Sequence, residues 1–321
     1  MEIGVLTTVF ADSSLADALP VINRLGIGKI EMGCGGLFPK NHCDPASLLA
    51  SPGALAEYRD LLRSYGVEVA ALAIHGQPLH PDQEISQRYA TEFEQACLLA
   101  AELGVTKLTL LAGLPEAYPG DRYPNWVWYP FPPENLRRLE WQWAERLIPY
   151  WKRQAPIAAD CGLRLCFEMH PAELVYNVRT LLRLRDAIGP VVGANLDPSH
   201  LTWQGMDITE VVSALSDVIY HVHAKDSRIN ARALSRNGII DSRPLGDVAE
   251  RSWLFRTIGY GQNEEWWRSF MSSLRAHGYD DVLCIEHEDP LLDPVEGLER
   301  GVEFLSQFVL RKPPSKLWYD A

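Results

Sequence analysis

Short runs of β-branched and other apolar residues alternate along the whole chain with longer segments in which apolar residues recur at helical spacing. The short runs are apolar throughout rather than at every second position, which is typical of parallel strands buried on both faces. The predicted strands are Ile3–Val9, Lys29–Glu31, Val67–Ile74, Lys107–Leu111, Arg164–Glu168, Val191–Asp197, Val218–His223 and Val282–Glu286. The predicted helices are Ser14–Leu25, Ser47–Tyr65, Glu84–Leu103, Glu134–Asp160, Val178–Ile188, Ile208–Leu215, Glu264–His277 and Pro294–Leu310.

Glycines mark the ends of many of these helices, as expected for the residue that follows a helix C-terminus. They are Gly26, Gly66, Gly104, Gly162, Gly189 and Gly278. Eight strands alternating with eight helices predict an α/β fold, a single-domain (β/α)8 TIM barrel over residues 1–321. The alternative is a doubly wound sheet, which usually carries a glycine-rich phosphate-binding turn after its first strand. No such turn follows Val9, and we interpret Gly33-Cys34-Gly35-Gly36 as an ordinary tight turn.

Two connections are longer than usual for this fold. Residues 112–133 contain six aromatic side chains among prolines, and residues 225–261 contain six arginines. Both segments follow a predicted strand, so we expect both over the C-terminal face of the barrel, where TIM-barrel active sites form. They are predicted to be lids or walls of a pocket; the alternative is an insertion that is decorative or serves oligomer contacts.

Composition narrows the function classes. The chain has 321 residues, 47% of them hydrophobic and 22% charged, which is ordinary for a globular domain. Its net charge of −12 disfavours a nucleic-acid partner, because duplex binding relies on clustered Lys and Arg, and fits a small neutral substrate. The six cysteines form no C-x-x-C pair, so we expect reduced core cysteines rather than a zinc knuckle.

The sequence also predicts where the protein acts. The first residues, MEIGVLTTVFADSS, lack a basic region and have too short an apolar stretch for a signal peptide. No segment approaches the ~20 apolar residues of a membrane span, so we expect a cytoplasmic protein without a membrane partner. A homo-oligomer is compatible with the sequence, which does not specify one.

The last four predicted strands each end on a residue of metal-ligand type: Glu168, Asp197, His223 and Glu286. Neighbouring barrel strands lie ~4.8 Å apart, so side chains at one height converge near the axis. Three buried carboxylates would repel each other unless a cation neutralised them. The set predicts one divalent ion, Mn²⁺ in the first place and Mg²⁺, Co²⁺ or Zn²⁺ as alternatives. Each acid taken alone could instead be a loop residue or a helix cap.

Other residues are expected around this ion. His221 shares a face with His223 but lies one pleat deeper, so we interpret it as a hydrogen-bonded core histidine. His200, three positions after Asp197, can reach the metal or a substrate hydroxyl. Glu31 and His75 end the second and third predicted strands and are predicted substrate contacts; rim residues hydrogen-bonded within the protein are the alternative.

Each long loop offers a further substrate contact. Arg256 lies among aromatic residues in the second long loop and can bind a substrate oxygen, or can be solvated or salt-bridged instead. In the first long loop, Trp126 is the predicted substrate contact among the aromatic residues, because such rings can stack on the apolar face of a sugar.

These residues lie in motifs that resemble the xylose isomerase-like TIM barrel superfamily, the sugar phosphate isomerase/epimerases. The superfamily includes ketose 3-epimerases, inosose isomerases and dehydratases and, more distantly, endonuclease IV. The motifs are Asp197-x-x-His200, His223-x-Lys225-Asp226, Phe255-Arg256 with Gly259 and Gly261, and Gly278-Tyr279 followed by Ile285-Glu286-His287-Glu288-Asp289. The resemblance implies that Glu168, Asp197, His223 and Glu286 bind one metal, that the two glutamates act as acid and base, and that His200 and Arg256 steady substrate oxygens.

Two features depart from the epimerase pattern, and a third argues against the nuclease branch. His223 and Glu286 are 63 positions apart, more than is usual in the epimerases, so the role of Arg256 rests on a segment that differs. The aromatic loop is also larger, which indicates a bulkier substrate than a free hexose. The fourth strand ends Leu108-Thr109-Leu110-Leu111, which offers no ligand for the multi-metal cluster of a nuclease.

The resulting prediction is a metal-dependent isomerase or epimerase acting on a sugar, keto-sugar or cyclitol. The metal would polarise a carbonyl, one glutamate would remove the neighbouring proton, and the other would return a proton to the opposite face of the enediolate. One alternative is a lyase, a dehydratase or an enzyme cleaving 3-keto-glycosides, in which a leaving group departs after the same proton abstraction. The other is a sugar-binding subunit without turnover, against which the complete ligand set argues.

Overall fold

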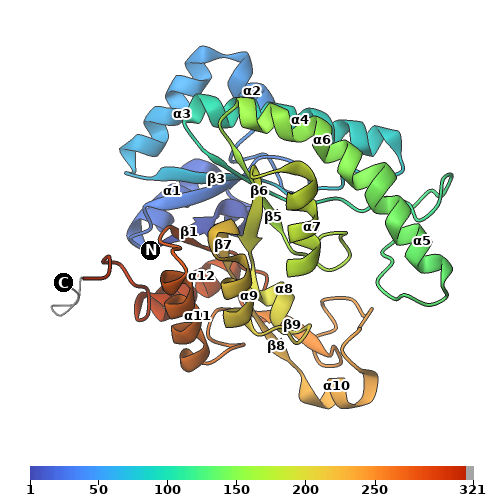
Figure 1. The fold of residues 1–321 in the computed structure, drawn as a ribbon. Coiled ribbons are helices and arrows are strands. Elements are labelled where there is room, and N and C mark those ends of the chain that lie inside the picture. Colours follow the sequence, from blue (N-terminus) through green and yellow to red (C-terminus); the bar gives the residue numbers. More distant parts are fainter. Residues whose placement is uncertain (316–321) are drawn as a thin grey trace, which may run out of the picture.

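A computed structural model describes residues 1–315 of the chain. Eight parallel strands close into a barrel in the order β1-β10-β7-β6-β5-β4-β3-β2, with the helices packed around it (Figure 1). The strands are β1 (Glu2–Leu6), β2 (Lys29–Gly33), β3 (Glu68–Ile74), β4 (Lys107–Leu110), β5 (Arg164–Glu168), β6 (Val192–Leu196), β7 (Ile219–Ala224) and β10 (Val282–Ile285). All eight predicted strands are confirmed, and the chain is a single-domain TIM barrel.

Helices cover the outside of the barrel, as predicted. They are α1 (Leu15–Arg24), α2 (Pro45–Ala50), α3 (Pro52–Ser64), α4 (Gln83–Leu103), α5 (Glu134–Trp141), α6 (Ile148–Asp160), α7 (Val178–Ile188), α8 (Pro198–Thr202), α9 (Ile208–Leu215), α10 (Ala231–Asn237), α11 (Glu264–Ala276) and α12 (Pro294–Ser306). A π-helical turn, Gln142–Leu147, joins α5 to α6, so the long predicted helix 134–160 is continuous. Each of the six glycines predicted at helix ends has a positive φ.

Several element boundaries differ from the prediction, two of them at the N-terminal end of the chain. The first strand ends at Leu6 rather than Val9, because residues Thr7–Phe10 form a 3-10 turn. The predicted helix 47–65 is two helices that meet at Ser51, which is extended and caps α3 by accepting a hydrogen bond from the amide of Ala54. Pro52 follows at the first position of α3, where its missing N–H costs nothing.

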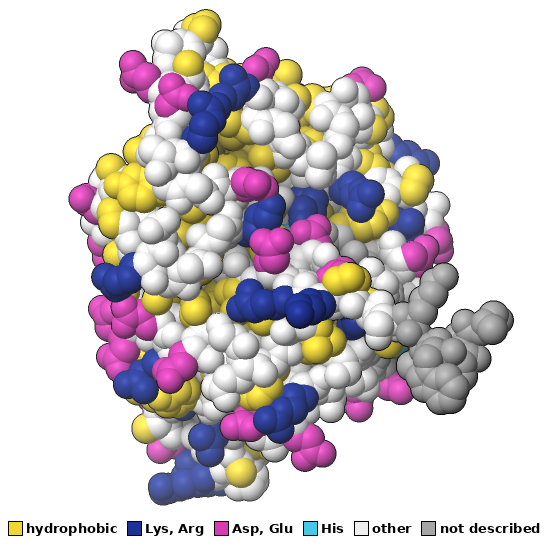
Figure 2. Space-filling model, turned by 90° about the vertical axis from the view of Figure 1, so that its left-hand side faces the viewer, with side chains coloured by type: hydrophobic (Ala, Val, Ile, Leu, Met, Phe, Trp, Pro, Cys, Tyr) yellow, Lys and Arg dark blue, Asp and Glu magenta, His cyan; other side chains and the backbone are white. Residues whose placement is uncertain are grey.

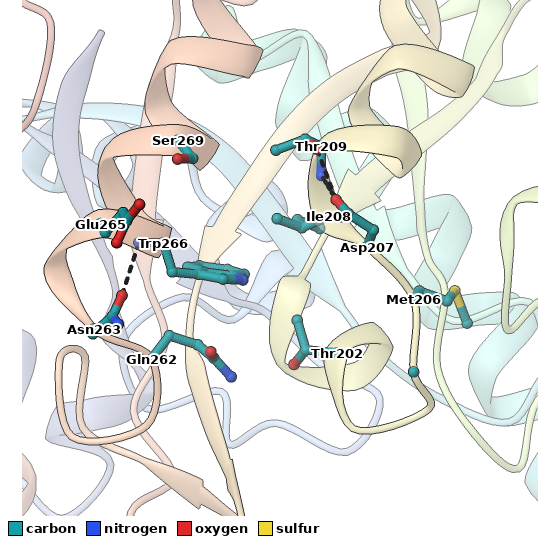
Figure 3. A pocket seen from close by; sticks show the side chains of 11 residues that line it. Thr202, Met206, Asp207, Ile208, Thr209, Gln262, Asn263, Glu265, Trp266 and Ser269 are labelled. Atoms are coloured by element: carbon teal, nitrogen blue, oxygen red, sulfur yellow. Dashed lines mark hydrogen bonds between the residues drawn. The ribbon is translucent and has the colours of Figure 1, made fainter.

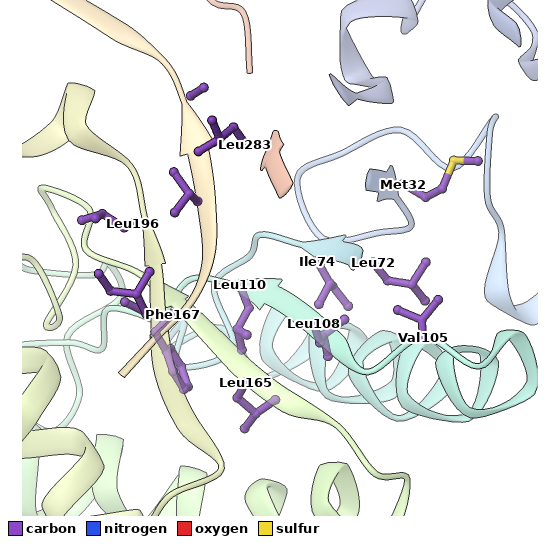
Figure 4. Close-up of a cluster of buried hydrophobic side chains, with 14 of the residues drawn as sticks. Met32, Leu72, Ile74, Val105, Leu108, Leu110, Leu165, Phe167, Leu196 and Leu283 are labelled. Atoms are coloured by element: carbon purple, nitrogen blue, oxygen red, sulfur yellow. The ribbon is translucent and has the colours of Figure 1, made fainter. Parts of the chain in front are cut away.

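The barrel strands separate apolar from polar side chains. Leu108 and Leu110 of β4 and Leu165 and Phe167 of β5 belong to one buried hydrophobic cluster (Figure 4). The intervening positions carry polar groups, and hydrogen bonds such as that from Thr109 on β4 to Glu31 on β2 cross the barrel interior. The strands are therefore buried on both faces, but the inner face is polar toward the C-terminal mouth.

The two long loops differ in their content of regular secondary structure. Residues 225–261 contain an antiparallel pair, β8 (Asp226–Ile229) and β9 (Trp253–Arg256). The two strands are connected by α10 and irregular chain, which project from the barrel (Figure 1). Residues 112–133 contain neither helix nor strand.

Helix hydropathy, surface charge and the cysteines add three further observations. Within residues 1–315, no helix is both long enough and apolar enough to cross a bilayer. On the face seen in Figure 2, Lys and Arg side chains are interspersed with Asp and Glu rather than gathered in one patch. All six cysteines are free, and five of them are buried.

Candidate metal and active site

The four predicted metal ligands come together at the C-terminal mouth of the barrel. Glu168 is the last residue of β5, Asp197 follows β6, His223 lies in β7 and Glu286 follows β10. One ligand atom from each of the four lies within 4.8 Å of those of the other three, and all four side chains are buried. The barrel register therefore brings together residues that are up to 118 positions apart in the sequence.

His223 presents its two ring nitrogens to different partners. Its Nδ1 lies 3.1 Å from Glu168 Oε2 and 3.0 Å from Glu286 Oε2, whereas its Nε2 lies 2.9 Å from Glu31 Oε2. His221 is fully buried below it, with Nε2 2.8 Å from the same Glu31 oxygen. The prediction that His221 is a hydrogen-bonded core histidine is confirmed.

The donor set fits a hard divalent cation. Asp197 Oδ2 and Glu286 Oε2 are buried and have no hydrogen-bond partner among the residues described. Burial raises the pKa of Asp197. Burial also acts to raise the pKa of Glu286, but the positive charges of Lys225 and His223 have the larger effect and lower that pKa to about 2. Burial acts to raise the pKa of Glu168 as well, but the contacts with His75, His200 and His223 together hold that pKa well below its ordinary value. Carboxylate oxygens that accept no hydrogen bond and gather around one point are donors that suit a hard divalent cation.

Lys225 also belongs to the site, although the sequence analysis assigned it no role there. Its buried Nζ lies 3.3 Å from Glu286 Oε2 and 3.7 Å from Asp197 Oδ2, contacts Glu288, and sits 4.3 Å from the centre of the Phe255 ring. Burial lowers the pKa of this ammonium, but the surrounding carboxylates raise it well above its ordinary value. Strand parity could have found it, because Lys225 continues the alternation of His221 and His223.

Three more histidines surround Glu168. His200 in α8 places Nε2 3.2 Å from Glu168 Oε1 and 3.3 Å from Asp197 Oδ2, and His75, just after β3, places Nε2 3.3 Å from Glu168 Oε2. His170 was not predicted; its ring centre is 4.2 Å from that of His200. Burial and the neighbouring charge of His200 lower the pKa of His170 to about 3, so its ring is neutral.

A cavity of about 390 Å³ opens above these residues, within the usual size range of small-molecule pockets. Its lining residues are Thr8, Leu37, Phe38, His75, Leu111, Glu168, His170, His200, Lys225, Glu286, His287 and Glu288. Leu37 and Phe38, which the sequence analysis did not identify, supply an apolar wall from the loop after β2. A larger groove of about 630 Å³ between α8, the start of α9 and α11 contains none of the predicted ligands (Figure 3).

The structure places three predicted substrate contacts away from this cavity. β2 continues to Gly33, so Glu31 lies one pleat deeper than predicted and its carboxylate is fully buried. The Nε of Arg256 lies 3.0 Å from Asp289 Oδ2, which turns the arginine to an ion pair within the protein. Trp126 packs edge-on against Tyr176, with ring centres 5.4 Å apart. Substrate contact by these three residues is not supported by their placement.

The two predicted lids also differ in whether they reach the cavity. The second long loop begins in the pocket with Lys225, and its Phe255 ring lies 5.2 Å from that of His200. The first long loop follows β4 at the same end of the barrel, but none of residues 112–133 lines the cavity among the residues described. Tyr123 and Trp128 of this loop are 78% and 49% exposed, and five of its six aromatic side chains, all but Trp126, are exposed in this structure.

The closed eight-stranded barrel and the ligand set at its mouth define the class of protein. The family model of the xylose isomerase-like TIM barrel matches residues 20–308, and the chain belongs to this family. It is 36% identical over 312 residues to the uncharacterized protein YfiH of Bacillus subtilis (strain 168), covering 96% of this chain and 99% of that protein. It is 29% identical over 111 residues to the inosose dehydratase of Geobacillus kaustophilus (strain HTA426), covering 34% of this chain and 35% of that protein.

Solved structures share the fold. The D-allulose 3-epimerase from a Methylomonas species superimposes with a TM-score of 0.63 at 17% identity, covering 96% of this chain and 98% of that one. Epimerases and dehydratases therefore both occur among the proteins that this chain resembles.

Proposed function

We propose that the protein is a metal-dependent isomerase or epimerase of a sugar, keto-sugar or cyclitol. The observation that carries the proposal is the meeting of Glu168, Asp197, His223 and Glu286 within 4.8 Å, with buried oxygens of Asp197 and Glu286 that accept no hydrogen bond from the described residues. These four residues would hold one divalent ion, Mn²⁺ in the first place. When bound, such an ion polarises a substrate carbonyl and makes the hydrogen on the neighbouring carbon more acidic.

Glu168 and Glu286 are the proposed base and acid. They project from β5 and β10, which are separated around the barrel by β6 and β7, so the two carboxylates approach the site from different sides. Stereochemical inversion requires proton removal from one face of a planar intermediate and proton delivery to the other. One glutamate removes the proton, and the other supplies a proton to the opposite face.

The surrounding side chains would orient the substrate. His75 and His200 already contact Glu168, and their rings line the cavity, where they can donate to or accept from substrate hydroxyls. Leu37 and Phe38 form an apolar surface on one side of the cavity, suited to the C–H face of a sugar ring. A small carbohydrate with polar and apolar faces matches this division.

Lys225 favours a second candidate function, a lyase. Inversion returns a proton to carbon, whereas elimination delivers a proton to the leaving group instead. The buried ammonium of Lys225, 3.3 Å from Glu286 Oε2, is a proton donor distinct from the two glutamates and could serve the leaving group, and the similarity to an inosose dehydratase agrees with this function. Loss of water or of an aglycone would follow abstraction of the same proton.

The test has two parts. Metal content is measured on the protein as purified, and after chelation and reloading with Mn²⁺. The loaded protein is then incubated with a panel of keto-sugars and keto-cyclitols in D₂O, and proton NMR follows exchange at the carbon beside the carbonyl. We expect one ion per chain and metal-dependent exchange; an epimer as product supports the first function and an unsaturated product the second. A protein that binds no divalent ion and exchanges no substrate proton would contradict both.

A further inference from the structure

The buried carboxylate of Glu31 receives three hydrogen bonds inside the barrel. Its Oε2 lies 2.8 Å from His221 Nε2 and 2.9 Å from His223 Nε2, and its Oε1 accepts from Thr109 Oγ1. Glu31 lies on β2, whereas the histidines lie on β7 and the threonine on β4, and neither strand is a neighbour of β2 in the barrel. These contacts therefore reach across the barrel rather than along a strand pair.

These contacts commit one ring nitrogen of His223 to Glu31 and leave the other facing the proposed metal site. A carboxylate accepts hydrogen bonds, so the Nε2 atoms of both histidines donate to Glu31. Nδ1 of His223 faces the other way, 3.1 Å from Glu168 Oε2, 3.0 Å from Glu286 Oε2 and 3.1 Å from Asn195 Nδ2. Nδ1 is therefore the ring nitrogen that a cation held by these carboxylates would meet.

We propose that Glu31 is a positioning residue: it holds His223, through Nε2, in the tautomer and orientation that present Nδ1 to the metal. The inference rests on the proposed metal site. Carboxylates behind ligating histidines raise the basicity of the ligand and fix its orientation, and their loss weakens metal binding about 10- to 100-fold in general. A buried charge without partners would be costly. The positioning role explains why a carboxylate that does not line the cavity is nevertheless buried beside His223.

A competing interpretation makes Glu31 itself a metal ligand. Glu31, His221 and Cys284 also offer ligand atoms within 4.8 Å of one another, one layer below the proposed site. If a second ion bound there, the protein would hold two ions per chain, and removal of Glu31 would abolish one of them. The positioning role instead requires one ion per chain in both the wild type and the variant.

The experiment measures Mn²⁺ affinity and stoichiometry by competition with a chromophoric chelator, for the wild type, Glu31→Gln and a matched control. The control is Glu116→Gln, which removes a buried carboxylate that pairs with Arg146, outside the cavity lining. We expect Glu31→Gln to weaken binding about 10- to 100-fold with one ion still bound at saturation, and Glu116→Gln to change it less than about threefold. Equal affinities in the wild type and Glu31→Gln would overturn the inference and leave the metal site intact. A wild type that binds no ion would overturn both.

A second measurement does not depend on a stable variant. Nitrogen-15 NMR of histidine-labelled wild type loaded with Zn²⁺ reports which nitrogen of His223 is protonated. We expect Nε2–H and a metal-bound Nδ1, with the Nε2–H protected from exchange by its bond to Glu31. A metal-bound Nε2, or two ions per chain, would refute the positioning role.

Discussion

The two halves of the barrel use buried acids in opposite ways. In the second half, Asp197 and Glu286 present carboxylate oxygens that have no hydrogen-bond partner among the described residues, around a common point. In the first half, Glu31 is equally buried, but its carboxylate accepts from two histidines and a threonine. All three carboxylates are buried, so hydrogen bonding distinguishes them: Glu31 accepts hydrogen bonds, whereas these Asp197 and Glu286 oxygens contact His200, His223 and Lys225 only at ion-pair distance.

This division extends to the loops. The second half contributes Lys225 to the pocket and orders its long loop as a β-hairpin with a helix. The first half contributes the apolar wall of Leu37 and Phe38, while its own long loop exposes all of its aromatic side chains except Trp126. We therefore assign the charged chemistry to the second half and support and shape to the first.

The largest expected effect tests the charged half. Glu168→Gln and Glu286→Gln each keep an oxygen ligand and most of the shape, but remove the base. Each variant should retain Mn²⁺ and lose turnover by at least ~10²-fold, the low end for general acid–base catalysis. Substrate deuterium exchange should vanish in the variant that lacks the abstracting base. Full activity of both metal-loaded variants would refute the two-glutamate mechanism, and Glu116→Gln serves as the control with unchanged kcat.

Lys225→Met provides the next largest effect and separates the two candidate functions. The change keeps the length of the side chain but removes the ammonium beside Glu286. If the protein is a lyase, product formation should fall about 10- to 10²-fold while proton exchange continues, because only leaving-group protonation is lost. If it is an epimerase, exchange and inversion should fall together. Parallel assays of exchange and product on the same samples decide between them.

How much the sequence could predict follows the same division. The strand ends and the alternation of side chains indicated Glu168, Asp197, His223 and Glu286, since their convergence depends only on barrel geometry. The depth of Glu31 could not be predicted in this way, because a register shift between Ile30 and Glu31 and two further strand residues place it below the mouth. The pairing of Arg256 with Asp289 joins two segments distant in sequence, and local patterns carry no information about it.

The apolar wall was missed for a different reason. Leu37 and Phe38 reach the pocket because the chain turns at Gly36, where φ is +72° and an added Cβ would lie 2.1 Å from the carbonyl oxygen of His75. Only glycine fits this close approach of two backbones. The sequence showed the glycines but not which loop they would turn toward.

A smaller effect is expected at Glu173, which follows β5 in the second half and contacts Gln77 and the backbone of Gly113 in the first. Burial raises the pKa of Glu173 to about 8, against opposing hydrogen bonds from Gln77 and Gly113. A carboxyl whose folded pKa is raised stabilises the fold at low pH, and this contribution is lost as the pH rises from about 4.5 through 8. The Glu173→Gln side chain is neutral at every pH. Between pH 5 and 9 the free energy of unfolding of the wild type should therefore fall relative to that of the variant, by on the order of a few kcal/mol. Urea unfolding across this range measures the difference; parallel profiles of the two proteins would contradict it.

The smallest effects compare two aromatic residues of the first half. Phe38 lines the cavity and packs at a tilt against His75, with ring centres 4.8 Å apart, whereas Trp128 is half exposed and lies outside the lining. Phe38→Ala should raise KM by up to about tenfold with little change in kcat or Mn²⁺ affinity, because it removes apolar contact with the substrate but no charged group. Trp128→Ala should change kcat/KM by less than about twofold and the free energy of unfolding by less than about 0.5 kcal/mol, as is usual for surface positions. A loss in Trp128→Ala as large as in Phe38→Ala would show that residues 112–133 close over the bound substrate. In that case the first half would supply a lid as well as a wall, and the assignment of this loop to the outside of the site would be wrong.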